Sequence, residues 1–467
     1  MHRLKRAKGR ALSGSEAWLL VAALGGLVVL NVPVLGLDAW AFRTGPVHAS
    51  GMFASLVSAS HGHWDLGLLR SGAVLAGVLV AVLAAAVLAG GRLRLRWAVV
   101  SATVVIAALL LPGVALQAGL RQSTAPWFYT NDSTYQIEIA GKLLRHGSNP
   151  YGHDYASSGL ERFYSLDGSV KPQVEKQQVA LHHFAYFPGA AIAAAAWGAL
   201  PKPLSDFRFL VVLCALALFP AALLFPGRLG PRLALGALLA ANPLIVHSVW
   251  FGTADALSLL LVVCAFGLAS RSRFSAAAAL LGGAVLCKQF ALVAVPFLFV
   301  MFLRKAEWRR LKAPAIYFTA VVLAGLVPFL VADPGALWTD TVKYGTGTYR
   351  IIGYGLAALL LRAHVIASRT GYYPFIPLAF LVWLPLTVWL LWLQRRSRSL
   401  WSGAVGFSLS VFLLLFLARV FQTSYLIWPL SAGLIALLLK GAEDVEELGD
   451  QAAVTAKRAP VPEAGGR

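Results

Sequence analysis

Residues 276–302 read AAAALLGGAVLCKQFALVAVPFLFVMF, and this stretch decides how the chain is arranged in a membrane. It is apolar except at Lys288 and Gln289, and basic clusters at 271–273 and 304–312 flank it. Positive clusters favour the cytoplasmic side of a membrane, and one continuous span cannot join two cytoplasmic ends. We therefore predict a broken helical hairpin that turns near Lys288 toward the opposite face. Non-helical backbone at that depth must line protein or a water-filled cavity.

The composition of the 467-residue chain agrees with this interpretation. Hydrophobic residues make up 58% and charged residues 13%, whereas globular proteins carry about 25% charged residues. The mean hydropathy is +0.71. Apolar runs of roughly 20 residues, the length that crosses a bilayer core, recur from residue 17 to residue 419, and one more follows. We predict an all-α polytopic membrane protein of about 11–13 transmembrane or re-entrant segments, folded as one domain over residues 1–440.

The formal charge of +20 is distributed in short clusters between the apolar runs. A nucleic-acid-binding protein gathers such charge along one face, whereas membrane proteins concentrate it in cytoplasmic connections. We expect these clusters to be cytoplasmic, and we expect no nucleic-acid partner. The six clusters are residues 1–10, residues 92–96, Arg228 with Arg232, residues 271–273, residues 304–312 and residues 395–398.

The two ends of the chain are predicted to be cytoplasmic. Residues 1–10 are basic and precede the apolar run 17–37 without a cleavage site, which favours a retained anchor over a cleaved signal peptide. Residues 441–467 begin with an acidic run and continue with Ala, Pro and Gly, so we predict a disordered tail there.

Counting apolar runs from the basic clusters predicts which loops face outward. A large loop over residues 119–183 and a second over 333–371 fall on the external face, together with the turn at 252–255 and the stretch 421–424. The run 184–200 is short, and we expect it to dip into the membrane and return outside, with a full span as the alternative. We expect a protein of the bacterial plasma membrane whose functional face is external.

Asp132 stands where an apolar segment emerges into the first external loop. A carboxylate near the membrane surface can take a proton from a hydroxyl nucleophile, and partial burial adjusts its basicity for that task. The alternative is a helix cap, because Asn131-Asp132-Ser133 precedes the helix-like run 135–144. The polar turn Gly147-Ser148-Asn149-Pro150-Tyr151 that follows favours a general base.

Lys288 is the second candidate of the chain. An ammonium between two apolar half-segments requires an anion or a polar cavity, and a lipid phosphate would satisfy it; the alternative is snorkelling to the interface. Arg350 follows the polar run 344–349 and is predicted to add a bidentate phosphate contact. An ordinary interfacial arginine is the alternative at that position.

Other polar and aromatic residues of the external segments are candidates for binding a sugar or an acceptor. Adjacent histidines on a helix point about 100° apart and make poor joint metal ligands, so we expect hydrogen bonding at His182 and His183 and no metal site. Asp255 can equally be a charge favoured by the dipole of the helix that it opens. The predicted binding residues are Tyr135, Asn149, Tyr151, His182, His183, Tyr186, Asp255, Gln422 and Tyr425.

These features together resemble the GT-C glycosyltransferases, and most of all glycosyltransferase family 87. The likeness covers roughly residues 132–429 and is carried by pattern rather than by a strict signature. Three apolar segments precede the first large loop, where the family usually has one, and Gln422 with Tyr425 stand where a His is common. The pattern consists of Asp132, residues 147–151, Tyr186-Phe187-Pro188, Gly252-Thr253-Ala254-Asp255, Leu286-Cys287-Lys288-Gln289 and residues 421–429.

The resemblance implies a mannosyltransferase that takes its sugar from a polyprenyl-phosphate donor without a cofactor. It implies Asp132 as catalytic base and Lys288 as a contact of the donor phosphate, with a glycolipid or polysaccharide as acceptor and membrane lipids around it. A polyprenyl phosphate leaves as a stable anion, so it needs electrostatic support rather than a proton. One carboxylate is then enough, and we expect inversion at the anomeric carbon.

Two other classes of protein share part of this pattern. A transporter or flippase of lipid-linked sugars also has many spans, a broken hairpin and an intramembrane lysine, but it concentrates polar groups near the midplane rather than in external loops. A third interpretation is a structural membrane subunit. If the protein is such a subunit, Asp132 and Lys288 can be replaced without loss of function.

Overall fold

The computed structural model describes residues 11–34, 67–123, 131–160, 181–202, 204–305, 308–348, 350–397 and 399–458. Within these ranges, seven helices are long and apolar enough to cross a membrane, or eight if the bent pair α9–α10 counts as one span. Five shorter apolar helices of 10–17 residues accompany them in the same ranges. The prediction of an all-α polytopic membrane protein is confirmed.

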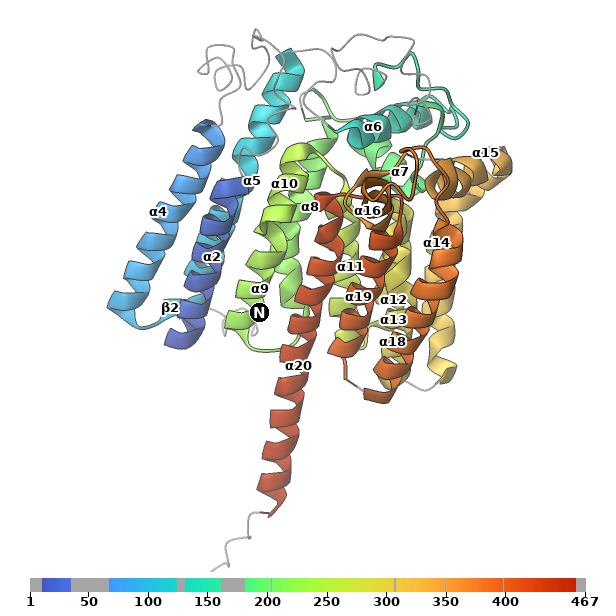
Figure 1. The fold of residues 1–467 in the computed structure, drawn as a ribbon. Coiled ribbons are helices and arrows are strands. Elements are labelled where there is room, and N and C mark those ends of the chain that lie inside the picture. Colours follow the sequence, from blue (N-terminus) through green and yellow to red (C-terminus); the bar gives the residue numbers. More distant parts are fainter. Residues whose placement is uncertain are drawn as a thin grey trace, which may run out of the picture.

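The elements follow one another in the order of Figure 1. The first part of the chain contains β1 (Ala11–Leu12), α2 (Gly14–Val34), α4 (Gly67–Gly90), β2 (Leu93–Arg94), α5 (Leu95–Ser123), α6 (Asp132–Arg145), α7 (Pro188–Trp197), α8 (Phe207–Ala221), η4 (Ala222–Leu224), α9 (Leu229–Ala241), α10 (Pro243–Phe251), α11 (Asp255–Ser270), α12 (Phe274–Cys287) and η5 (Gln289–Val293). The second part contains α13 (Ala294–Lys305), η6 (Trp308–Leu311), α14 (Lys312–Ala332), α15 (Pro334–Trp338), η7 (Thr339–Thr348), β3 (Ile352–Gly353), α16 (Leu356–Arg362), α17 (Phe375–Leu378), η8 (Ala379–Trp383), α18 (Leu384–Ser397), α19 (Trp401–Leu417), β4 (Val420–Phe421), η9 (Thr423–Leu426) and α20 (Ile427–Arg458).

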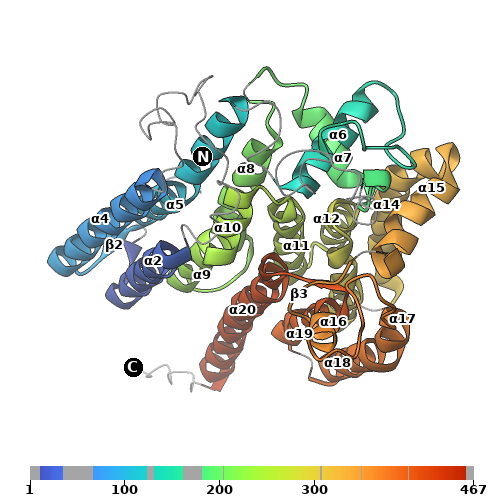
Figure 2. The ribbon, with the colours of Figure 1, turned by 45° about the horizontal axis from the view of Figure 1, so that its top comes forward.

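Small residues allow the helices of the bundle to approach closely, as is common in membranes. A Cβ atom at Gly72 of α4 would lie 2.6 Å from the carbonyl oxygen of Ala108 in α5. A Cβ atom at Gly236 of α9 would lie 2.8 Å from the carbonyl oxygen of Phe219 in α8. Helices α2, α4 and α5 form one flank of the molecule and α14 to α18 the other (Figure 2).

The hairpin predicted for residues 276–302 is present. Helix α12 ends at Cys287, and α13 returns beside it. The return is shown by the rings of Phe274, at the start of α12, and Phe302, near the end of α13, whose centroids are 4.9 Å apart. Lys288 lies at the turn with extended backbone (φ −152°, ψ 124°). The polar pair Lys288-Gln289 therefore interrupts the helix where the sequence indicated.

The basic clusters within the described ranges gather at one end of the bundle. Strand β1 pairs antiparallel with β2 and so brings residue 11 beside Arg94. The backbone N–H of Gly230 donates to Glu16, and Arg271 donates to the carbonyls of Leu223 and Leu224. The turn before α19 reaches α20, since the N–H of Leu400 donates to Glu443. The predicted cluster at residues 1–10 lies outside the described residues.

The opposite end of the bundle is covered by α6 and α7 (Figure 1). A Cβ atom at Gly141 of α6 would meet Ala194 and Ala195 of α7 within 2.8 Å, so the two helices are in direct contact. Helix α7 has only 10 residues. The N–H of Phe207, which opens α8, donates to Glu138 of α6, so the chain comes back to α6 after α7. This agrees with a segment that dips and returns.

The chain differs from the sequence prediction at its carboxyl-terminal end. The disordered tail was expected from residue 441, but α20 continues through this position to Arg458. Lys440 and Asp444 pair at i,i+4 spacing, and the residues that follow are rich in Ala, Glu and Leu, which favour helices. Acidic composition alone was therefore a poor guide here. Residues 459–467 lie outside the described residues.

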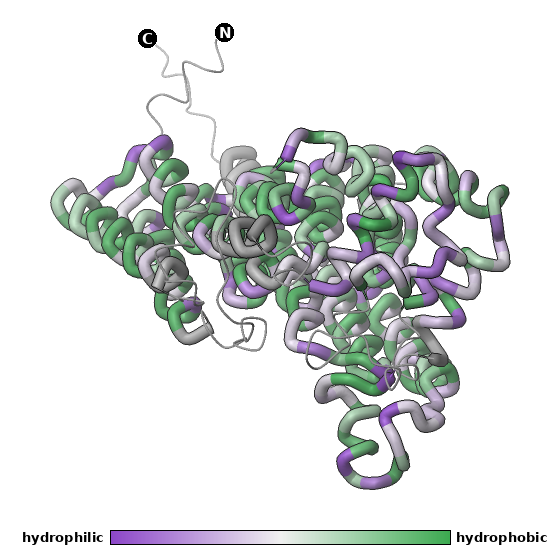
Figure 3. The backbone as a smooth tube through the Cα atoms, turned by 90° about the horizontal axis from the view of Figure 1, so that it is seen from above, coloured by the Kyte–Doolittle hydropathy of each residue, from purple (hydrophilic) through white to green (hydrophobic). Residues whose placement is uncertain are grey.

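The surface of the helical part is apolar, as a lipid environment requires. Figure 3 shows hydrophobic residues along the helices and hydrophilic residues mainly in the segments that connect them. Large side chains such as Val331, Leu381 and Leu88 are more than 70% exposed. These faces are the ones that bilayer lipid would cover.

Candidate functional site

Lys288 is positioned by the break between α12 and η5. Its N–H still donates to the carbonyl of Ala284 at 2.9 Å, which completes the last turn of α12. Its side chain is 13% exposed, and Nζ lies 3.4 Å from Oδ1 of Asp255. The ammonium predicted to need an anion therefore has a carboxylate partner from another helix.

Asp255 is the first residue of α11, and its side chain is 2% exposed. The indole Nε1–H of Trp428, in α20, donates to Oδ1 of Asp255 at 2.9 Å. The carboxylate therefore joins three parts of the chain: the start of α11, the hairpin turn and the start of α20. Position at a helix N-terminus adds a favourable dipole interaction. The sequence left two interpretations of Asp255 open, a charge favoured by the helix dipole and a residue of the binding site. Its position in the structure is compatible with both.

Aromatic rings surround the Lys288 ammonium. Nζ lies 5.3 Å from the ring centroid of Tyr186 and 5.2 Å from that of Phe290, within the range of cation–π attraction. The Phe290 ring lies 5.2 Å from Tyr425 and 5.7 Å from Trp428. The late stretch 421–429, predicted as part of the site, thus reaches the Lys288 side chain through Phe290.

Tyr186 connects Lys288 with Asp132. A side-chain hydrogen bond joins Tyr186 to Ser133, and burial raises the pKa of the Tyr186 phenol, with the charges of Asp132 and Asp255 adding to the rise. The phenol therefore remains protonated at neutral pH. We call these side chains the Lys288 group: Asp132, Ser133, Tyr186, Asp255, Lys288, Phe290, Tyr425 and Trp428.

The start of α6 sets the position of Asp132. Asn131, not Asp132, is the N-cap: its side chain accepts from the N–H of Ser133 at 2.9 Å. Asp132 is the first helical residue, is partly buried, and accepts from the same N–H at 2.8 Å. The hydroxyl of Thr134 donates to the carbonyl of Gly252, which fixes this end of α6 to the turn before α11. The capping role proposed as the alternative thus belongs mainly to Asn131.

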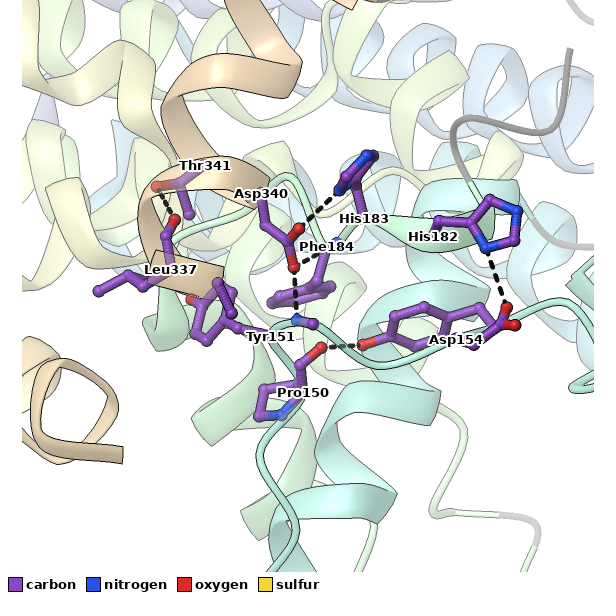
Figure 4. A network of polar contacts seen from close by, with 12 residues as sticks. Pro150, Tyr151, Asp154, His182, His183, Phe184, Leu337, Asp340 and Thr341 are labelled. Atoms are coloured by element: carbon purple, nitrogen blue, oxygen red, sulfur yellow. Dashed lines mark hydrogen bonds and ion pairs between the residues drawn. The ribbon is translucent and has the colours of Figure 1, made fainter. Parts of the chain in front are cut away.

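A second cluster centres on Asp340, a carboxylate that sequence reasoning missed (Figure 4). Its side chain is 2% exposed. Oδ1 lies 2.7 Å from Nδ1 of His183, and Oδ2 accepts from the N–H of Gly152 at 2.9 Å and of Phe184 at 3.3 Å. The centroids of the His183 and Tyr344 rings lie 4.8 Å apart, with the rings tilted by 31°. We call Asp340, His183, Gly152, Phe184 and Tyr344 the Asp340 group.

Two tyrosines hold the first loop beneath this group. The Tyr151 hydroxyl donates to the carbonyl of Tyr186 at 2.8 Å, and the Tyr155 hydroxyl donates to that of Pro150 at 2.8 Å. Burial raises the pKa of both phenols, and the charge of Asp340 adds to the rise. Tyr151 was predicted to bind sugar, but its hydroxyl donates to the backbone carbonyl of Tyr186, a residue of the Lys288 group.

The remaining predicted residues lie around the two groups. Asn149 accepts from the N–H of Tyr151 at 3.1 Å and so shapes the turn, and the Tyr135 hydroxyl donates to the carbonyl of Ser158. His182 is half exposed and pairs with Asp154 at 3.1 Å. Gln422 is exposed and precedes η9. Arg350 lies two residues before strand β3, which pairs with β4 just before Gln422.

Asp340 and Trp428 are two polar residues of these groups that the list of predicted site residues left out. Asp340 lies in the segment 333–371 that was predicted to be the second external loop. The criterion used for Asp132, a carboxylate in a polar segment behind an apolar run, could therefore have found it. Trp428 stood in the stretch 421–429 but carried only the general signal of an interfacial aromatic residue.

The chemistry available at this end of the molecule combines a carboxylate, a phenol and an ammonium. Asp132 can accept a proton, Tyr186 can donate a hydrogen bond, and Lys288 can offer further N–H donors to an anion. Among the residues that the structure describes, His, Cys, Asp and Glu form no group of three that could hold a metal ion. The expected absence of a metal stays a prediction.

Comparison with known proteins gives one structural likeness. No protein family model and no curated protein matches the chain. A crystal structure of ArnT from Cupriavidus metallidurans bound to undecaprenyl phosphate is similar to 70% of this chain, with a TM-score of 0.41 and 16% sequence identity. The match covers 59% of the ArnT chain.

Proposed function

We propose that this protein transfers a sugar, mannose, from a polyprenyl-phosphate donor to a glycolipid or glycan acceptor on the external face of the membrane. The observation that carries the proposal is the convergence of Asp132, Tyr186 and Lys288 at the end of the bundle opposite to the basic clusters. These residues come from three separate segments. Their charges match a reaction between a hydroxyl nucleophile and a phosphate leaving group.

In the proposed reaction the acceptor hydroxyl attacks the anomeric carbon and gives its proton to the carboxylate of Asp132. The bond between that carbon and the donor phosphate oxygen breaks on the opposite side, so the configuration inverts. The polyprenyl phosphate leaves as an anion and needs no proton, in contrast to glycoside hydrolysis, which requires a second carboxyl group as acid.

Lys288 supports the leaving phosphate in this scheme. Only part of its hydrogen-bonding capacity faces Asp255 at 3.4 Å, because an ammonium has three N–H donors. The buried carboxylate of Asp255 and the neighbouring rings hold the ammonium in place before the donor arrives, which reduces the reorganisation that binding requires. Tyr186, protonated at neutral pH, supplies a neutral donor beside it. Arg350 adds a further phosphate contact on the side of strand β3.

The distribution of the basic clusters supports the external position of the proposed site. Positive clusters favour the cytoplasmic side, and the Lys288 group lies at the other end of the bundle. The isoprenoid tail would then occupy the bilayer beside the helices while the sugar phosphate meets the loops. Both termini are cytoplasmic in this arrangement.

The test is sugar transfer from polyprenyl-phosphate mannose in purified membranes, with a membrane extract as the acceptor source. Asp132→Asn should lower kcat by about 10²- to 10⁴-fold, the usual contribution of a general base, while donor binding stays unchanged. Asp154→Asn removes a carboxylate that is 67% exposed in the same loop and is the matched control. Equal transfer by the unmodified protein and Asp132→Asn would exclude Asp132 as the base.

A further inference from the structure

The carboxylate of Asp340 is almost fully occupied by donors. Oδ2 accepts from two backbone N–H groups, of Gly152 and Phe184, and Oδ1 faces Nδ1 of His183 at 2.7 Å. An ionised carboxylate only accepts hydrogen bonds. The proton between Asp340 and His183 is therefore carried by Nδ1, and this fixes the tautomer of the imidazole.

In the neutral imidazole this tautomer leaves Nε2 of His183 with a lone pair that can accept a hydrogen bond. The imidazole is 23% exposed, whereas Asp340 is 2% exposed, so the ring lies between the buried carboxylate and the open side of the loops. The Tyr344 ring covers one side of it at 4.8 Å. A histidine in this arrangement presents Nε2 as a hydrogen-bond acceptor of defined direction.

The short segment 183–186 connects the Asp340 group with the Lys288 group. Three residues span at most about 11 Å, so the Cα atoms of His183 and Tyr186 lie within that distance. Two side chains hold the segment in place: Gln136 donates to the carbonyl of His183 at 2.9 Å, and Gln289, next to Lys288, donates to that of Ala185 at 2.5 Å. The imidazole is thus held only three residues from Tyr186, whose ring centroid lies 5.3 Å from Nζ of Lys288.

We propose that Asp340 and His183 form the sugar-recognition pair of the site: Nε2 of His183 accepts a hydrogen bond from a hydroxyl of the donor sugar, and Asp340 acts as the positioning residue. This inference rests on the proposed function and adds to it the contact that distinguishes a sugar-bearing lipid phosphate from a bare one. No proton is transferred in this step.

Two substitutions separate recognition from loop structure. His183→Asn keeps an N–H near the position of Nδ1 and so retains the contact with Asp340, but it lacks Nε2. Asp340→Asn can turn its amide N–H toward Nδ1, which moves the imidazole proton to Nε2 and removes the acceptor. His364→Asn is the matched control, because His364 is exposed in the second external loop at φ 59°, a conformation that Asn tolerates.

The experiment measures the Kd of the purified full-length protein and these variants for polyprenyl-phosphate mannose and for polyprenyl phosphate without sugar. Loss of one neutral hydrogen bond should raise the Kd for the sugar-bearing lipid about three- to tenfold in His183→Asn and Asp340→Asn. The Kd for the sugar-free lipid should not change. His364→Asn should bind both lipids as the unmodified protein does.

Other outcomes overturn the proposal in distinguishable ways. An unchanged Kd for the sugar-bearing lipid in His183→Asn excludes the Nε2 contact and leaves the proposed function intact. Equal weakening of both lipids means that the pair only holds the loops together. An unmodified protein that binds neither lipid contradicts the proposed function itself.

Discussion

The carboxylate of Asp255 and the ammonium of Lys288 form an ion pair at the end of the bundle that α6 and α7 cover. Both side chains are largely buried, and removing one partner of such a pair leaves a charge without compensation, at a cost of about 3–5 kcal/mol. The pair therefore contributes to the fold as well as to the proposed phosphate site. A stability measurement can separate these two contributions.

We expect Asp255→Asn to lower the free energy of unfolding by several kcal/mol, and Lys288→Gln to do the same. The double variant should recover much of the loss, since neither charge remains buried alone. Thermal unfolding of the detergent-purified protein measures all four members of this cycle. Additive losses in the double variant would mean that the two side chains are not coupled.

At the level of single residues, the sequence predicted much of the candidate site. Asp132, Tyr186, Asp255 and Lys288 stood out because polar groups are rare and costly in an apolar chain, and the structure brings them together. The partner of Lys288 could not be predicted, because Asp255 is 33 positions earlier in the sequence and the contact depends on how α11 packs against the hairpin. The catalytic and binding roles of these residues stay predictions.

At the level of elements, the contact between α7 and α12 fixes the hairpin turn. A Cβ atom at Gly189 would lie 2.6 Å from the backbone carbon of Leu286, two residues before Lys288. We expect Gly189→Ala to push α7 away from the turn and to reduce both stability and sugar transfer. Unfolding and transfer assays on the same preparation measure the two effects.

Gly283→Ala provides the comparison for that substitution. Gly283 lies in α12, the helix that Gly189 of α7 contacts, and a Cβ atom at Gly283 would make an ordinary contact at 3.5 Å with Leu261. Ala is favoured over Gly inside a helix by roughly 0.5–1 kcal/mol, so this variant should be unchanged or slightly more stable. A loss as large as that of Gly189→Ala would contradict the close-packing argument.

The segment before α17 is predicted to lose stability at high pH. Burial raises the pKa of Tyr373 to about 12, and its hydroxyl donates to the carbonyl of Leu417 at 2.6 Å. A phenol with an ordinary pKa near 10 when unfolded therefore stabilises the fold fully below about pH 10. This contribution disappears as the pH rises toward 12, where the buried phenol ionises.

Tyr373→Phe lacks this contribution at every pH. We expect the unmodified protein to have the higher Tm below about pH 10 and the two Tm values to converge toward pH 12. Differential scanning fluorimetry in detergent measures the difference. A constant difference across this range would show that ionisation of Tyr373 is not involved.

The sequence predicted the hairpin and the long spans because both follow from local patterns of apolar and charged residues. It did not predict the two-residue strands, since β3 and β4 are separated by more than 60 positions and pair only in the folded chain. The prediction of a disordered tail does not agree with the structure at residues 441–458, which belong to α20. Helix-forming side chains outweighed the acidic composition there.

At the level of the whole molecule, the separation of the basic clusters from the loop-covered end gives a testable topology. Ser368 and Ser397 are both exposed; Ser368 follows α16, and Ser397 ends α18 beside one of the clusters. In a variant without Cys214, Cys264 and Cys287, we expect Ser368→Cys in intact cells to react with a membrane-impermeant maleimide. Ser397→Cys should react only after the membrane is opened.

The reverse pattern of labelling would place the Lys288 group on the cytoplasmic side and contradict the proposed transfer on the external face. Labelling of both positions in intact cells would mean that the chain does not keep one orientation. The sequence predicted one orientation from its six basic clusters. The structure adds that the clusters within the described ranges lie at one end of the bundle.

The hydrogen bond from Trp428 to Asp255 has a consequence for the order in which the protein is made. Ribosomes add about 5–20 residues per second, so a delay on the order of tens of seconds separates the synthesis of Asp132 from that of Trp428. Until α20 emerges, Asp255 lacks one of its partners and the Lys288 ammonium lacks part of its aromatic surroundings. A chain interrupted before its last span would carry the carboxylate of Asp132 without a finished Lys288 group, so a protein still being inserted would not yet be able to carry out the proposed transfer.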